Sequence, residues 1–200
     1  MVHPIIGKQD PEPTHDASRR RRISRPLAIL IAAVAIPLLI AGTIVGLYRA
    51  SSSGGDFHVI RLEGPAPAFD LADLRHPQAR ITLEQLRGKP LVVNFWASWC
   101  VPCRREMKGF EQVHAALGGR VMMLGIDTSD TRAPALSLAQ EVGATYPLAF
   151  DPDGAVALQF SVVGLPSTVF IDATGRMLER RLGALTPREL SRTIERLLLS

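Results

Sequence analysis

A chain of 200 residues has room for one domain of ordinary size and some additional segments. Hydrophobic residues make up 46% of the chain and charged residues 21%, which is typical of a globular protein and excludes a wholly disordered one. The net charge of +4 comes from residues 1–50, which carry seven basic and three acidic side chains, whereas residues 51–200 carry sixteen of each. Because the longer part is neutral, the sequence does not indicate a nucleic-acid-binding protein.

Residues 1–26 are expected to form a disordered basic tail, because they are rich in Pro, His and small polar residues and end in a cluster of five arginines. Residues 27–48 then contain no charged side chain. A helix of that length spans roughly 33 Å, which is enough to cross a bilayer. Since only Arg49 follows directly, the arginine cluster predicts that the tail is cytoplasmic and that the rest of the chain is extracytoplasmic, on the periplasmic side.

The apolar run could also be a cleaved secretory signal. Its length exceeds the usual apolar core of about 7 to 15 residues, and no Ala-x-Ala cleavage site follows it. An uncleaved signal-anchor, held in the lipid bilayer through residues 27–48, is therefore the preferred interpretation. Residues 49–57, rich in Ser and Gly, are expected to be a flexible tether, and residues 58–200 to be the folded domain.

The folded domain shows alternating strand and helix patterns that end in a hairpin and a helix. Strands are expected at 58–62, 69–71 (as an edge strand), 91–96, 121–126, 147–150, 169–171 and 177–182. Helices are expected at 82–86, from the cysteines to 117, at 133–142, in a short segment ending at 160, and from Pro187 to 198. This order predicts an α/β fold, with a mixed central sheet and helices on both faces.

The two cysteines of the chain, Cys100 and Cys103, stand where the apolar strand 91–96 gives way to a helix. The free N–H groups and the positive end of the helix dipole favour a thiolate on Cys100 and make it the expected nucleophile. Cys103 lies one helical turn on, where it can resolve a mixed disulfide. Pro102 fixes the turn between them without needing an N–H partner. This arrangement predicts a redox-active pair.

Three other interpretations of the cysteines are less consistent with the sequence. A structural disulfide closing so small a loop stabilises by only about 2 kcal/mol. A structural zinc site needs four ligands, yet no second cysteine pair exists and the five histidines show no paired spacing, so no metal is expected. Two inert buried thiols are not expected between Trp99 and Pro102 at a strand-to-helix junction.

The motif Trp96-Ala-Ser-Trp-Cys100-Val-Pro-Cys103 resembles the active site of the thioredoxin superfamily, and in particular its membrane-anchored TlpA/ResA/CcmG (DsbE)-like thiol-disulfide oxidoreductases. The segment 64–71 resembles the N-terminal extension of that branch, and 86–96 its approach to the active site. The segment 164–172 resembles its later proline loop. The resemblance covers about 64–199 and implies a thioredoxin-like fold without a cofactor.

The resemblance assigns roles to particular residues. Pro166 matches a cis-proline that faces the cysteine pair and shapes the substrate groove, and Trp99 and Pro102 are the other expected substrate contacts. Glu106 matches an acidic residue that exchanges protons with Cys103. Its alternative is an ordinary solvated glutamate in a charged turn.

Three more residues have expected roles. Asn94 stands where thioredoxins carry a buried Asp, and because an amide cannot relay protons, Glu106 is the better candidate for a relay. Trp96 is assigned to the core. Asp127, at the end of a strand, is expected to cap a turn.

The resemblance implies a reductase of disulfides in exported proteins. It suggests apocytochrome c as substrate, hence a role in cytochrome c maturation, and a CcdA- or DsbD-like membrane protein as electron donor. Oxidation of exported thiols by the same residues is the nearest alternative. A peroxiredoxin-type peroxidase is disfavoured, because those enzymes carry Thr where this chain has Ala97. A non-catalytic factor that binds cysteine-containing clients is a further alternative.

Overall fold

The computed structural model describes residues 37, 58–62 and 64–200. The tail 1–26, the anchor 27–48 except Pro37, and the tether 49–57 lie outside the described residues and stay predictions. Among the helices that the structure describes, none combines the length and apolar character that crossing a bilayer requires.

The described part of the chain contains one eight-stranded mixed sheet, in the order β1-β8-β7-β4-β5-β6-β2-β3. The central strands β4, β5 and β6 run parallel, and β7 is antiparallel to β4. The strands are β1 (His58–Arg61), β2 (Asp70–Asp73), β3 (Arg80–Thr82), β4 (Leu91–Trp96), β5 (Met122–Thr128), β6 (Leu148–Asp151), β7 (Ser167–Ile171) and β8 (Met177–Leu182).

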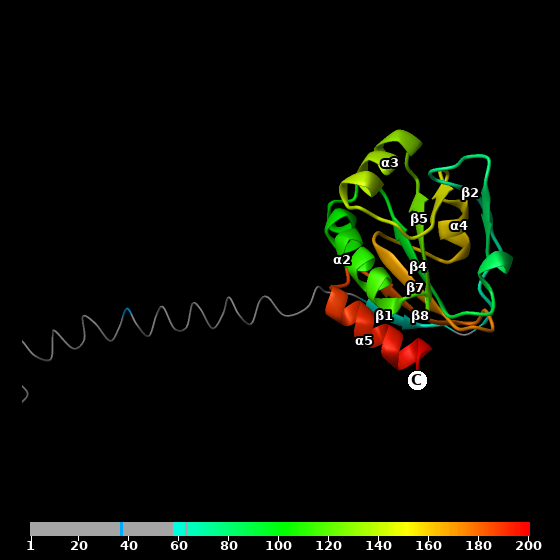
Figure 1. Ribbon diagram of the computed structural model, residues 1–200, viewed down its shortest axis with the longest axis vertical. Helices are drawn as coiled ribbons and strands as arrows, with labels where there is room; N and C mark the ends of the chain where they lie inside the picture. Colours follow the sequence, from blue (N-terminus) through cyan, green and yellow to red (C-terminus); the bar gives the residue numbers. More distant parts are fainter. Residues whose placement is uncertain (1–36, 38–57, 63) are drawn as a thin grey trace, which may run out of the picture. The chain divides into compact units, whose positions relative to one another are not determined.

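Helices cover both faces of this sheet, which confirms the predicted fold (Figure 1). One face packs against α2, α3 and α5, and the other against α4 and the 3₁₀ turn η1. Their bounds are η1 (Glu84–Leu86), α2 (Val101–Leu117), α3 (Arg132–Glu141), α4 (Ala155–Gln159) and α5 (Pro187–Leu198).

Strand β4 is central because all six of its residues are buried. Successive side chains of a strand point to opposite faces, so Val92 and Trp96 join the core beneath α2, whereas Val93 and Phe95 join the core beneath α4. The continuous apolar run is therefore what a strand covered on both faces requires. Strand β4 therefore leads from the rigid centre of the sheet directly to the start of α2.

The sheet differs from the expected one at its far edge. Strand β2 is not an edge strand, because it pairs with both β6 and β3. Strand β3 was not predicted: it has three residues, and its last, Thr82, also exchanges hydrogen bonds with Gln85 at the turn η1. The segment expected as a helix at 82–86 is thus the end of a strand followed by a single 3₁₀ turn.

Candidate active site

Cys100 and Cys103 form a disulfide at the N-terminus of α2, with their Cα atoms 5.3 Å apart. Cys100 is the N-cap residue, and its Sγ accepts a hydrogen bond from the N–H of Cys103 at 3.3 Å. Pro102 occupies the first turn, where a missing N–H costs nothing. Cys100 is 4% exposed and Cys103 is fully buried. The first sulfur therefore sits at the positive end of the helix, where a thiolate is stabilised.

Pro166 directly precedes β7, and the sheet register places it at the end of β4 that leads to the cysteines. Its bond to Leu165 is cis, as the resemblance implies. Ser167, the next residue, pairs with Phe95 in the antiparallel ladder of β7 and β4. The proline is thus level with Trp96, where β4 passes into the loop of residues 97–100, called here the cysteine loop. The hydroxyl of Ser167 donates to the carbonyl of Gly164 at 2.7 Å and holds this turn.

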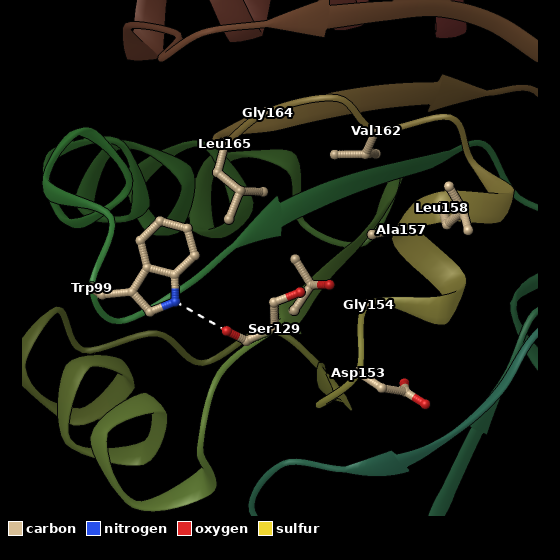
Figure 2. A pocket seen from close by; sticks show the side chains of 10 residues that line it. Trp99, Ser129, Asp153, Gly154, Ala157, Leu158, Val162, Gly164 and Leu165 are labelled. Carbon is tan, nitrogen blue, oxygen red and sulfur yellow. Dashed lines mark hydrogen bonds between the residues drawn. The ribbon is translucent and has the colours of Figure 1, made fainter.

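Trp99 lies beside the cysteines as an exposed aromatic side chain. It is 61% exposed, and its indole N–H donates to the carbonyl oxygen of Ser129 at 3.1 Å, the dashed bond in Figure 2. Its ring forms one wall of a pocket of about 430 Å³ between the cysteine loop, the end of β5, α4 and the proline loop. The lining residues are Trp99, Thr128, Ser129, Asp153, Gly154, Ala157, Leu158, Val162, Gly164 and Leu165. The lining combines apolar side chains with the polar Thr128, Ser129 and Asp153.

Glu106 is buried one turn after Cys103, on the same side of α2. Its Oε1 accepts from the N–H of Leu185 at 2.7 Å, and its Oε2 accepts from Nδ2 of Asn94 at 3.0 Å. Burial outweighs these two hydrogen bonds and raises the pKa of Glu106 to about 8. The prediction of a buried, perturbed carboxyl at this position is confirmed, and its alternative as a solvated glutamate is wrong.

Two features surround the Glu106 carboxyl. Glu106 lines a second pocket with Pro102 and Arg105. Oδ1 of Asn94 has no partner among the described residues. An amide turned by 180° presents that oxygen to a protonated Glu106, so Asn94 can accommodate both protonation states.

Asp127 is placed differently from the expectation. Strand β5 continues to Thr128, so Asp127 is a fully buried strand residue opposite Trp96 and not a turn cap. Burial, followed by the negative charge of Asp130, raises the pKa of Asp127 to about 8. Every residue from Met123 to Thr128 is buried, so no alternation along the strand marked Asp127 as an interior residue. No group of three or more His, Cys, Asp or Glu side chains within the described residues is arranged to hold a metal ion.

Known proteins are similar to this chain in sequence and in fold. The model of the AhpC/TSA family matches residues 62–180. The thiol:disulfide interchange protein DsbE of Allochromatium vinosum is 37% identical over 123 residues, which are 61% of this chain and 67% of that protein. DsbE of Escherichia coli K12 is 34% identical over 165 residues, covering 80% of this chain and 88% of that protein.

A solved structure agrees. The crystal structure of a DsbF homologue from Corynebacterium diphtheriae superimposes with a TM-score of 0.64 at 27% identity, covering 73% of this chain and 96% of that one. Three findings indicate the same family: the fold, the disulfide at the start of α2 and the similarity to these relatives. The chain therefore belongs to the thioredoxin-like AhpC/TSA family and, within it, to the DsbE-type thiol:disulfide interchange proteins, so that it is a thiol-disulfide oxidoreductase.

Proposed function

We propose that this chain is a membrane-anchored reductase that acts on disulfides of exported proteins outside the cytoplasmic membrane. The observation that carries the proposal is the site around α2: a sulfur at the helix N-cap, a buried second sulfur and a buried carboxyl with a pKa of about 8. Apocytochrome c is the proposed client, with cytochrome c maturation as the process. The proposed electron donor is a CcdA- or DsbD-like membrane protein.

The reaction runs through two exchanges between thiols and disulfides. The thiolate of Cys100 attacks a client disulfide, forms a mixed disulfide and releases the first client thiolate. Cys103 then loses its proton and attacks Sγ of Cys100, which releases the second client thiolate and leaves the disulfide seen in the structure. Glu106 is the proposed acceptor of the Cys103 proton, since a group with a pKa near the working pH exchanges protons in both directions. The client disulfide gains two electrons, and the membrane electron donor then returns two electrons to the Cys100–Cys103 disulfide.

Exposed apolar side chains at the start of α2, on α4 and before Pro166 support an unfolded polypeptide client. Trp99, Val101, Leu158 and Val163 are each more than 60% exposed. Trp99 and Leu158 line the pocket in Figure 2. Substrate contacts at Trp99, Pro102 and Pro166 would bring an extended client segment across Cys100.

The anchor is supported by the apolar run at 27–48 and by the extent of similarity to the Escherichia coli DsbE. A match over 80% of 200 residues begins no later than about residue 41, so it reaches into that run. The basic residues before the run support a cytoplasmic tail and a folded domain on the periplasmic side.

The reduction potential of the Cys100/Cys103 couple tests the direction of electron flow. A value near −270 mV is expected for a reductase, and one near −120 mV would instead support oxidation of exported thiols. Rapid turnover of hydrogen peroxide would replace both roles by that of a peroxidase.

Client capture tests the roles of the two cysteines. Full-length Cys103→Ser should accumulate a mixed disulfide through Cys100 with an oxidised peptide containing Cys-x-x-Cys-His, the c-type haem attachment sequence. A matched oxidised peptide without the His and its flanking residues is the control for client preference, and Cys100→Ser is the control for the attacking sulfur. Trapping in Cys100→Ser, or none in Cys103→Ser, contradicts the assigned roles.

A further inference from the structure

The carboxyl group of Asp127 is buried without a hydrogen-bond donor. The residue is 0% exposed, and neither Oδ1 nor Oδ2 has a partner among the described residues. Asp127 lies opposite Trp96 in the β4–β5 ladder, at the point where β4 passes into the cysteine loop. An ionised carboxylate without a donor is strongly unfavourable in such a place. A protonated Asp127 avoids that cost.

Asp130, three residues on, carries the carboxyl group that interacts most strongly with that of Asp127. Oδ2 of Asp130 accepts from the N–H of Ser98 at 2.6 Å, and Oδ1 accepts from the N–H of Thr131 at 2.6 Å. These donors favour the charged form of Asp130. Two ionised carboxylates are both acceptors, so they can bond only when one carries a proton. The carboxyl that carries the proton is therefore that of Asp127.

The other charged groups around Asp127 do not accept a hydrogen bond from its protonated carboxyl. Arg132, at the start of α3, donates to the carbonyls of Asp73 and Leu74 and stacks over Phe150. Asp151, at the end of β6, is occupied by the N-terminal N–H groups of α4 and the Thr128 hydroxyl. On the β4 side, Trp96 is uncharged. Asp130 is thus the acceptor available to a protonated Asp127.

We propose that Asp127 and Asp130 share one proton and act together as positioning residues for the cysteine loop. Protonated Asp127 donates to Asp130, and Asp130 accepts from Ser98, two residues before Cys100. The same loop after β5 also holds the Trp99 indole through the Ser129 carbonyl (Figure 2). Loss of the proton places two carboxylates in contact, and their repulsion weakens both attachments.

The ionisation of the two groups agrees with this geometry. Burial, the charge of Asp130 and their mutual contact raise the pKa of Asp127 to about 8. Partial burial opposes ionisation of Asp130, but the hydrogen bonds from Ser98 and Thr131 outweigh it and lower the pKa of Asp130. The pair therefore loses its proton just above neutral pH, and the cysteine loop is held most firmly below that range. The inference rests on the disulfide chemistry of Cys100 and is independent of the client.

The test is an NMR pH titration of the full ¹⁵N-labelled chain in its oxidised form, in which neither cysteine titrates. The Ser98 backbone N–H and the Trp99 indole N–H are expected to shift together, with one midpoint near pH 8. In Asp127→Asn the side-chain amide donates to Asp130 at every pH, so both signals lose this step. In Glu106→Gln, which removes the other buried carboxyl with a pKa of about 8, the step persists.

Three results would overturn the proposal: no step in the unmodified chain, a step that survives Asp127→Asn, or a step that disappears in Glu106→Gln. A second variant covers a failure of Asp127→Asn to fold. Asp130→Asn keeps an acceptor for Ser98 but removes the facing charge, so the midpoint should move to lower pH, and an unchanged midpoint contradicts the pairing. Failure of the proposed client role would appear in the trapping experiment and would leave this titration unaffected.

Discussion

The substitution Glu106→Gln should change how the stability of the oxidised chain depends on pH. Burial raises the pKa of Glu106 from 4.5 to about 8, so between these values the folded chain holds a proton that the unfolded chain has released. Stability attributable to Glu106 is therefore greatest below about pH 4.5 and falls by about 1.4 kcal/mol per pH unit up to about pH 8. At pH 7 the loss amounts to at most about 3.4 kcal/mol.

Asp127 contributes a second loss of the same sign, because its pKa is also raised to about 8. Between pH 5 and 7 the unmodified chain should therefore lose up to about 2.7 kcal/mol per pH unit from the two groups. Glu106→Gln should remove about half of that slope. The side-chain oxygen of Gln can still accept from Leu185, and its amide can donate to Oδ1 of Asn94 after the Asn94 amide turns.

The measurement is urea unfolding of the full oxidised chain in mild detergent at pH 5, 6 and 7, followed by tryptophan fluorescence. Glu195→Gln, on the exposed side of α5, is the matched control and should keep the slope of the unmodified chain. A Glu106→Gln variant with that full slope would refute the conclusion that Glu106 holds a proton at neutral pH. A steeper slope would refute it equally.

Two further predictions concern packing and helix capping. Gly125→Ala should destabilise the fold by about 1–3 kcal/mol, because a Cβ there would lie 2.6 Å from the Leu148 side chain and would also meet two aromatic rings; an unchanged thermal midpoint would contradict the close packing. Thr186→Ala should cost about 1 kcal/mol in urea unfolding, because it removes the hydroxyl that caps α5 at the Glu189 N–H. Thr186→Ser, which keeps the hydroxyl, should cost less, and equal losses in both variants would argue against the cap.

Much of the site followed from local sequence. The Cys-x-x-Cys spacing at a strand-to-helix junction placed Cys100 at the helix N-cap, because a thiolate gains from the free N–H groups there. The continuous apolar run at 91–96 identified the central strand, since burial on both faces requires apolar residues throughout. The Thr186-Pro187 start identified α5 for an equally local reason.

Contacts between residues far apart along the chain could not be predicted from the sequence. Strand β2 was expected at an edge, but it pairs with β3 and β6, whose short segments carry little periodic signal. Asp127 was expected to cap a turn, and the strand instead runs one residue past it. Its neighbour Asp130 bonds to Ser98, which is 32 residues away along the chain. No pattern of nearby residues reports such a contact.

By itself the sequence determined the fold class, the redox pair and the expectation of an anchor before the folded domain, because each depends on residue type and short spacing. Only the tertiary structure decided the surroundings of the sulfurs. It buried Glu106 against Asn94 and Leu185, and it buried Asp127 in β5 opposite Trp96 while bonding Asp130 to Ser98. The physical reason is that a carboxyl's pKa depends on burial and on the neighbours brought to it, and these are properties of packing that residue identity leaves open.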